Sequence, residues 1–323
     1  MKKVLILSTG GTIEMQQKGG GFSLSSTAAI DISSLDSMSD ITIVLRKYLN
    51  LPSPHITPEI MVDIAEELRK IEISGEFDGV VVTHGTDTLE ETAFMADIHL
   101  EGVLPVAFTA AMRSSSELGV DGPRNIRSAV RVVCTKTDNP GVTVVLNDEI
   151  HAAGRVTKTC TSNVSSFDSP GYGPLGFVDD DRVIFHRLPI WRMNLPPGPL
   201  VLEKKVGLVR VAAGYGHDLI DFLTGSNYKG IIVQAFGRGN VHPDTADAIE
   251  RAIDSGVVVI ITSRCHEGRV LGVYSYPGGG VDLRKRGVLF AGDMSGCKIR
   301  LLLMACLGRK MKKDQIGKML SSL

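Results

Sequence analysis

Short apolar runs rich in β-branched residues recur along the chain, and longer segments of mixed character separate them. The runs that we predict as strands cover residues 4–7, 41–45, 79–82, 103–108, 142–146, 206–211, 230–233 and 257–261. They are nearly continuous in apolar residues, which is typical of parallel strands covered by helices on both faces. The pattern therefore predicts a mostly parallel sheet.

Helix signals fill the segments between these runs. Thr57 and Pro58 suit the N-cap and the first helical position, and apolar residues then recur every three or four positions from Ile60. A similar start at residues 242–244 and an apolar stretch at 294–307 predict two further helices. Strands that alternate with helices in this way predict an α/β fold with a doubly wound sheet.

A proline-rich segment interrupts this alternation beyond the middle of the chain. Residues 189–205 contain four prolines and a glycine, a density that neither a helix nor a central strand tolerates. We therefore expect a larger N-terminal domain with the doubly wound, mostly parallel sheet at residues 1–188. A linker would follow at 189–205, and a smaller C-terminal α/β domain at 206–323.

Charge and cysteine content narrow the range of partners and compartments. The formal net charge is -1, whereas nucleic-acid and membrane-surface partners select a clustered basic field. The five cysteines form no Cys-x-x-Cys pair, which argues against a zinc ribbon or a redox dithiol and is typical of a reducing compartment. The apolar run at residues 4–7 is too short for a signal peptide. We expect a cytoplasmic protein with no nucleic-acid or membrane partner.

Polar turns follow the first and the third predicted strand, and ligands of open parallel sheets bind beyond the carboxyl ends of the strands. Residues 8–13 read Ser-Thr-Gly-Gly-Thr-Ile, so two glycines expose backbone N–H groups beside threonine hydroxyls. The segment lacks the third glycine of a Rossmann fingerprint and the lysine of a P-loop. A purely structural turn remains an alternative.

The second turn, residues 83–88, reads Thr-His-Gly-Thr-Asp-Thr. Asp87 could cap the helix that follows, or it could belong to a reactive cluster. Lys158, in Thr-Lys-Thr at 157–159, could be a solvated surface lysine. If the fold brings it to Asp87, the amine and the carboxylate form a proton relay for a threonine hydroxyl. No Gly-x-Ser-x-Gly elbow or His-x-x-x-His spacing occurs, so neither a serine nucleophile nor a metal site is expected.

The two turns resemble the paired signature segments of bacterial-type L-asparaginases and glutaminases, including the cytoplasmic type I enzymes. The similarity continues through Met112-Arg113, Asp121-Gly122-Pro123-Arg124-Asn125, Leu146-Asn147-Asp148, Val156-Thr157-Lys158-Thr159, Gly237-Arg238-Gly239-Asn240 and Ala291-Gly292-Asp293-Met294. It spans nearly the whole chain. The resemblance implies an amidohydrolase that converts L-asparagine to L-aspartate and ammonia, with no cofactor or metal, assembled as a homotetramer or homodimer.

The resemblance also implies residue roles. Thr9 would be the nucleophile that forms an acyl-enzyme, and Lys158 would be the base that Asp87 orients beside Thr86. Backbone N–H groups near Gly10 and Thr86 would stabilise the oxyanion. The residues expected at the substrate are Gly10, Ser53, Gly85, Thr86 and Asp87, of which Ser53 would hold the α-carboxylate and Asp87 the α-amino group.

Three features depart from the family pattern. Phe22 occupies the best match to a tyrosine that partners the nucleophile, and phenylalanine has no hydroxyl. The preceding glycines, residues 19–21, suit the hinge of a lid, although a simple turn is the alternative. Pro54 and His55 replace a side-chain donor and an acid. These changes leave open an amidase for glutamine or another amide, or a catalytically weakened amino-acid-binding protein.

Overall fold

Two compact units, Met1–Pro196 and Pro197–Leu323, make up the chain. The computed structural model describes residues 1–18, 21–24, 32, 35, 38, 40–189 and 192–321. Two of the predicted lid glycines, at 19 and 20, lie outside the described residues, as do the linker residues 190 and 191 and the side chain of Phe22. Each unit has its own sheet and helices, so the predicted fold class, a larger unit with a mostly parallel sheet and a smaller α/β unit, is confirmed.

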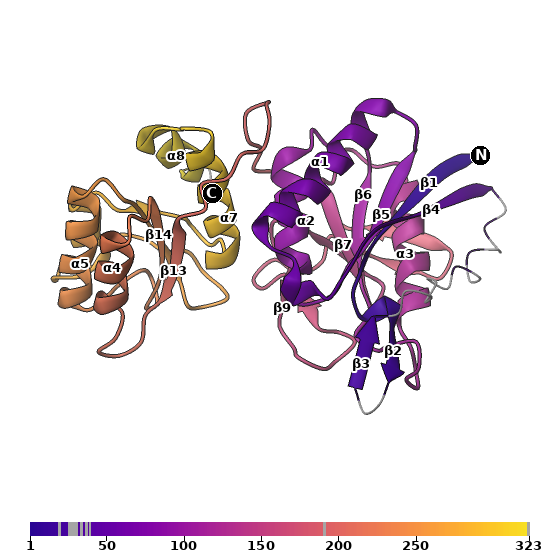
Figure 1. Ribbon diagram of the computed structural model, residues 1–323, viewed down its shortest axis with the longest axis horizontal. Helices are drawn as coiled ribbons and strands as arrows, with labels where there is room; N and C mark the ends of the chain where they lie inside the picture. Colours follow the sequence, from indigo (N-terminus) through magenta and orange to yellow (C-terminus); the bar gives the residue numbers. More distant parts are fainter. Residues whose placement is uncertain are drawn as a thin grey trace. The chain divides into compact units, whose positions relative to one another are not determined.

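The described strands of the first unit form a sheet of order β12-β11-β8-β7-β6-β5-β1-β4 (Figure 1). Their bounds are β1 (Lys2–Gly10), β4 (Ile41–Leu51), β5 (Gly79–Thr83), β6 (Val106–Thr109), β7 (Val142–Leu146), β8 (Glu149–Ala152), β11 (Gly176–Asp179) and β12 (Arg182–Phe185). Five neighbouring strands, β4, β1, β5, β6 and β7, pair in parallel. The other three, β8, β11 and β12, extend the sheet beyond β7 with antiparallel pairing. The chain passes from β1 to β4 on one side and then to β5 on the other. This reversal puts a topological switch point at the carboxyl ends of β1 and β5.

Helices cover both faces of this sheet (Figure 1). On one face, α1 (Pro58–Ser74) and α2 (Leu89–His99) pack against each other. On the other face, α3 (Gly122–Cys134) buries apolar residues against Val4, Ile6 and Val81 of the sheet. The nearly continuous apolar runs of the strands follow from this burial on both faces.

The strand predicted at 103–108 begins later, at Val106. The carboxylate of Glu72, near the end of α1, accepts hydrogen bonds from the backbone N–H groups of Gly102 and Val103. These groups are therefore unavailable to a neighbouring strand. Among the described strands, the hydrophobic pattern did not predict β8, β11, β12 or β16 (Leu289–Phe290). It also did not predict four short strands that pair as two hairpins, β2 (Met15–Lys18) with β3 (Gly21–Leu24) and β9 (Thr157–Lys158) with β10 (Phe167–Asp168).

The second unit has a parallel sheet of order β13-β14-β15-β16. Its elements are β13 (Val206–Arg210), α4 (His217–Gly225), β14 (Gly230–Ala235), α5 (Pro243–Asp254), β15 (Val258–Ser263), α6 (Gly280–Lys285), β16 (Leu289–Phe290), α7 (Gly296–Gly308) and α8 (Lys313–Leu320). The α7 helix packs on β13 and β14, and α4 packs beside α5. This unit is a smaller α/β layer structure with its own apolar core.

The boundary between the units falls inside the proline-rich segment. Its first part is attached to the first unit, because Arg192 forms an ion pair of 2.8 Å with Asp97 and the N–H of Leu195 donates to a carbonyl of α2. Its last part belongs to the second unit, where the N–H of Glu203 donates to the carbonyl of Met304. The described residues between 189 and 205 form no helix or strand.

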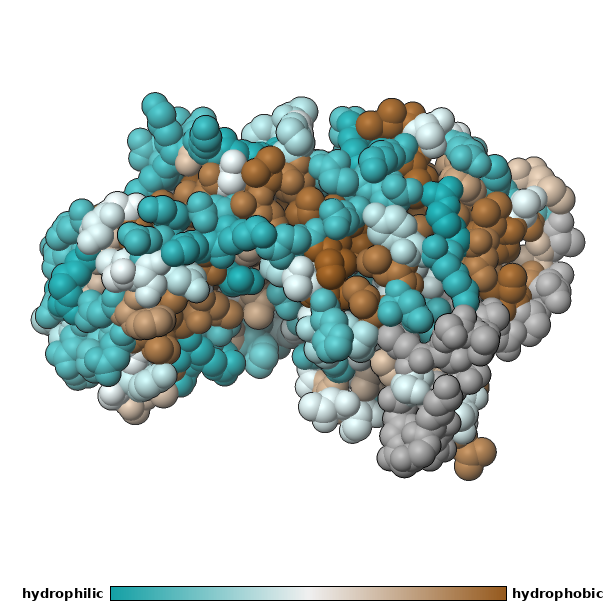
Figure 2. Space-filling view, viewed as in Figure 1, coloured by the Kyte–Doolittle hydropathy of each residue, from teal (hydrophilic) through white to brown (hydrophobic). Residues whose placement is uncertain are grey.

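The surfaces of both units are mixed in character. Hydrophilic residues dominate the visible face of the second unit, and apolar patches interrupt the visible face of the first (Figure 2). Among the described residues, no helix combines the length and the apolar character that crossing a bilayer requires.

Candidate active site

The turns that follow β1 and β5 lie side by side at the switch point. Ser8 of β1 and Thr83 of β5 are the last register partners of the two strands, so their pairing ends just before Thr9 and His84. The hydroxyl of Thr9, which is fully buried, donates to the carbonyl of Thr83 at 2.8 Å. The first turn therefore places a threonine hydroxyl directly against the strand that leads into the second turn.

Glycine is required where these turns meet. Gly11 has φ +88°, and a Cβ atom there would stand 2.4 Å from the backbone N and Cα of Gly85. A Cβ on Gly85 would in turn stand 2.8 Å from the hydroxyl of Ser53. Gly10 has φ +104° and a similarly close approach to the backbone of β4. Side chains at these positions would separate the two turns, so the glycines account for the compactness of the site.

Lys158 reaches this site from β9. Its Nζ donates to Thr86 Oγ1 at 2.8 Å and to Asp87 Oδ1 at 2.7 Å. The side chain of Lys158 is 17% exposed and that of Asp87 is 56% exposed, so the pair lies at the mouth of the site. The description of Lys158 as a solvated surface lysine is therefore wrong. The alternative that Asp87 caps the following helix is also wrong, because the N-cap of α2 is Thr88 and no side chain forms a cap hydrogen bond there.

Ser53 adds a third segment to the site. It opens η3 (Ser53–His55), a short 3-10 turn that follows β4, and its side chain is buried. The backbone N–H of Asp87 donates to Ser53 Oγ at 3.1 Å, and the hydroxyl of Thr88 donates to the Ser53 carbonyl at 2.8 Å. In both bonds Ser53 is the acceptor, and no described residue accepts the hydroxyl proton of Ser53, so this proton can be donated to an anion. Pro54 and His55 are exposed.

His84 is a site residue to which sequence reasoning assigned no role. Its Nδ1 lies 2.7 Å from the Gly85 carbonyl, which can only accept, so Nδ1 carries the proton. Nε2 then accepts from the hydroxyl of Thr92 at 3.0 Å. Complete burial lowers the pKa of His84 to about 4. The neutral ring therefore acts as a fixed support for the second turn. A buried neutral histidine has no signal in the sequence, because burial is decided by the fold.

Two residues of the wider motif shape neighbouring loops. The carboxylate of Asp121 accepts the backbone N–H groups of Met112 and Arg113. Asn125 accepts the backbone N–H of Asn147, which joins α3 to the turn after β7. Asn125 Nδ2 also donates to Asp121 Oδ2 at 3.1 Å, so the two side chains link each other to the backbone of the neighbouring loops.

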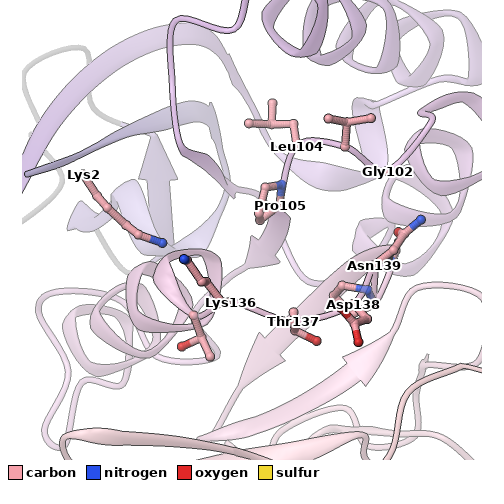
Figure 3. A pocket seen from close by; sticks show the side chains of 12 residues that line it. Lys2, Gly102, Leu104, Pro105, Lys136, Thr137, Asp138 and Asn139 are labelled. Atoms are coloured by element: carbon pink, nitrogen blue, oxygen red, sulfur yellow. Dashed lines mark hydrogen bonds between the residues drawn. The ribbon is translucent and has the colours of Figure 1, made fainter.

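A hollow at the opposite end of the strands contains none of the predicted site residues. It has a volume of about 470 Å³ and is lined by Lys2, residues 102–105 and residues 135–141, including Lys136 and Asp138 (Figure 3). Lys2 opens β1 and Pro105 precedes β6, so this hollow adjoins the amino ends of these two strands, whereas the two turns follow the carboxyl ends of β1 and β5. Among the described residues, no group of histidine, cysteine and acidic side chains is arranged to hold a metal ion.

Family models match both units. The model of the asparaginase N-terminal domain covers residues 3–191, and the model of the glutaminase/asparaginase C-terminal domain covers residues 205–320. Together they account for nearly all of the two sheets described above.

Individual relatives match over the same span. An L-asparaginase of Bacillus licheniformis is 33% identical over 310 residues, 95% of each chain. One component of the glutamyl-tRNA(Gln) amidotransferase of Pyrococcus abyssi is 32% identical over 99% of this chain and 75% of its own length. The crystal structure of a probable cytoplasmic L-asparaginase from Campylobacter jejuni matches 99% of both chains with a TM-score of 0.86 and 31% identity. The chain thus belongs to the asparaginase family and is an L-asparaginase-like amidohydrolase.

Proposed function

We propose that the chain hydrolyses the side-chain amide of L-asparagine to L-aspartate and ammonia, with Thr9 as the nucleophile. The observation that carries the proposal is the hydrogen bonding of Lys158 to both Thr86 and Asp87, in a turn that touches the turn of Thr9. L-asparaginases of the same length and fold support the choice of substrate.

The chemistry follows from these groups. Thr9 Oγ1 forms an ester bond with the amide carbon, the C–N bond breaks, and the hydroxyl proton reaches the leaving nitrogen, which departs as ammonia. Water then hydrolyses the ester, releases aspartate and restores the hydroxyl. In this second step the Thr86 hydroxyl takes a proton from the attacking water as it gives its own to the Lys158 amine, and that proton passes to the Thr9 oxygen when the ester bond breaks; Asp87 holds the amine in position.

Substrate recognition uses the remaining polar groups. Ser53 donates its hydroxyl proton to the α-carboxylate, and the exposed side of Asp87 accepts from the α-amino group. The backbone N–H of Thr86 forms no hydrogen bond among the described residues, and with groups near Gly10 and Gly85 it supports an oxyanion site. The reaction calls for no cofactor and no metal.

The decisive experiment compares Thr9→Val with Thr9→Ser in an ammonia-release assay with asparagine. Valine has the shape of threonine without the hydroxyl, so activity should fall at least about 10³-fold, whereas serine keeps the nucleophile and retains measurable turnover. Undiminished ammonia release by Thr9→Val would remove Thr9 from this role. Lys158→Met should also lose activity, and Lys70→Met, an exposed lysine of α1, is the matched control.

Glutamine is the second candidate substrate. The relative named as a component of the glutamyl-tRNA(Gln) amidotransferase matches almost the entire chain, and exposed Pro54 and His55 alter the surroundings of Ser53. Parallel assays with glutamine and a panel of other amides decide between the substrates. Aspartate binding in calorimetry, without turnover of any amide, would instead favour a binding protein.

Location and assembly are part of the proposal. The solved relative named as a probable cytoplasmic L-asparaginase supports a cytoplasmic location. The family resemblance supports a homotetramer or homodimer, which sedimentation of the purified protein measures directly. Monomeric protein with full activity would contradict an obligatory assembly.

A further inference from the structure

We infer that the buried pair formed by Ser8 and Glu14 is a clasp that positions the nucleophile. The inference deepens the proposed function and rests on it, because it assigns Glu14 as a positioning residue for Thr9. The clasp consists of the hydrogen bond from Ser8 Oγ to Glu14 Oε1.

The clasp closes the turn that contains Thr9. After Gly11 the chain turns back through η1 (Thr12–Glu14), whose start is marked by the bond from the Glu14 N–H to the Gly11 carbonyl at 3.0 Å. This reversal brings Glu14, which is 3% exposed, against Ser8, which is fully buried. The residues that flank the turn on its two sides are therefore joined by their side chains.

The clasp lies at the end of an otherwise apolar face. Strand alternation puts Ser8 on the same face as Ile6, the face that α3 covers, and parallel register puts the side chain of Thr83 beside it. Thr83 Oγ1 is buried and has no hydrogen-bond partner among the described residues.

A buried carboxylate at position 14 needs a reason. Desolvating a carboxylate or its acid is costly, and a well-packed apolar side chain at a buried position is commonly at least as stable. The carboxylate of Glu14 therefore contributes geometry rather than stability. Thr9 follows Ser8 directly, and its hydroxyl bonds to the carbonyl of the same Thr83 that lies beside the clasp. Movement of Ser8 consequently moves the nucleophile.

The test compares Glu14→Ala with Glu14→Gln in steady-state kinetics with asparagine, at a temperature well below the melting temperatures of all variants. Alanine opens the clasp, and we expect kcat to fall about 10²-fold with KM within about threefold, the cost of a misplaced reacting group. Glutamine keeps an oxygen that accepts from Ser8, so kcat should stay within about threefold of the parent. Ser8→Ala combined with Glu14→Ala should be no slower than either single variant, because both open the same clasp.

Glu72→Ala is the matched control. The carboxylate of Glu72 is also buried, with 2% of the side chain exposed. It accepts hydrogen bonds from Arg69 and from backbone N–H groups before the amino end of β6, away from the two turns. It should lower the melting temperature and leave kcat unchanged. An equal loss of kcat in this control, or full kcat in Glu14→Ala, would overturn the clasp. If Thr9→Val stays active, the proposed function fails; if that variant is inactive while Glu14→Ala is fully active, the clasp alone fails.

Discussion

Acidification should destabilise the first unit through His84, because its buried ring is neutral in the folded protein. The pKa of His84 is about 4 in the folded protein, whereas the ordinary value of 6.5 applies to the unfolded chain. Below pH 6.5 the unfolded chain therefore binds a proton that the folded protein excludes. Stability contributed by this group is complete above pH 6.5 and is lost as the pH falls towards 4. With these two pKa values, the free energy of unfolding falls by about 2 kcal/mol between pH 7 and pH 5, and by about 3 kcal/mol between pH 7 and pH 4.

The assay compares urea unfolding of the parent with that of His84→Gln at several pH values between 7 and 4. Other titrating groups are common to both proteins, so the difference in unfolding free energy isolates His84. The parent should be the more stable protein at pH 7, and its advantage should shrink by about 2 kcal/mol at pH 5. A difference that does not vary with pH would refute the reasoning. So would an NMR titration of the His84 ring with a midpoint near 6.5.

Two further substitutions test the contacts between the turns. Gly11→Ala should destabilise by more than about 3 kcal/mol in thermal or urea unfolding, because its Cβ would overlap the backbone of Gly85. Gly75→Ala, at φ +61° with nothing within 4 Å, should cost about 1 kcal/mol, and equal effects of the two would contradict the overlap. Ser53→Ala removes the acceptor for the Asp87 N–H, so we expect KM for asparagine to rise about tenfold and kcat to change less than about threefold. Steady-state kinetics measures both constants, and an unchanged KM would exclude Ser53 from substrate binding.

Sequence reasoning recovered the elements whose signals are local. Continuous apolar runs located the strands from β1 to β7 and from β13 to β15, apart from the short hairpin β2–β3, and the helix starts at Pro58 and Pro243 agree with α1 and α5. It extended β6 too far at the amino end, because the competing carboxylate of Glu72 comes from a distant helix. It missed β8 to β12 and β16 because strands of two to four residues are too short to carry a clear periodic pattern.

For the site, the sequence by itself determined the inventory: two glycine-containing turns after parallel strands, with hydroxyls, a carboxylate and an amine in motifs that resemble one family. Tertiary structure alone decided which of these groups meet. Lys158 is 72 residues from Thr86 along the chain and 2.8 Å from it in space. The same holds for the neutral state of His84 and for the burial of Glu14, since both depend on the packing of distant segments. The physical reason is that periodicity and turn preference act over a few residues, whereas hydrogen-bond distances and desolvation depend on everything the fold packs around a side chain.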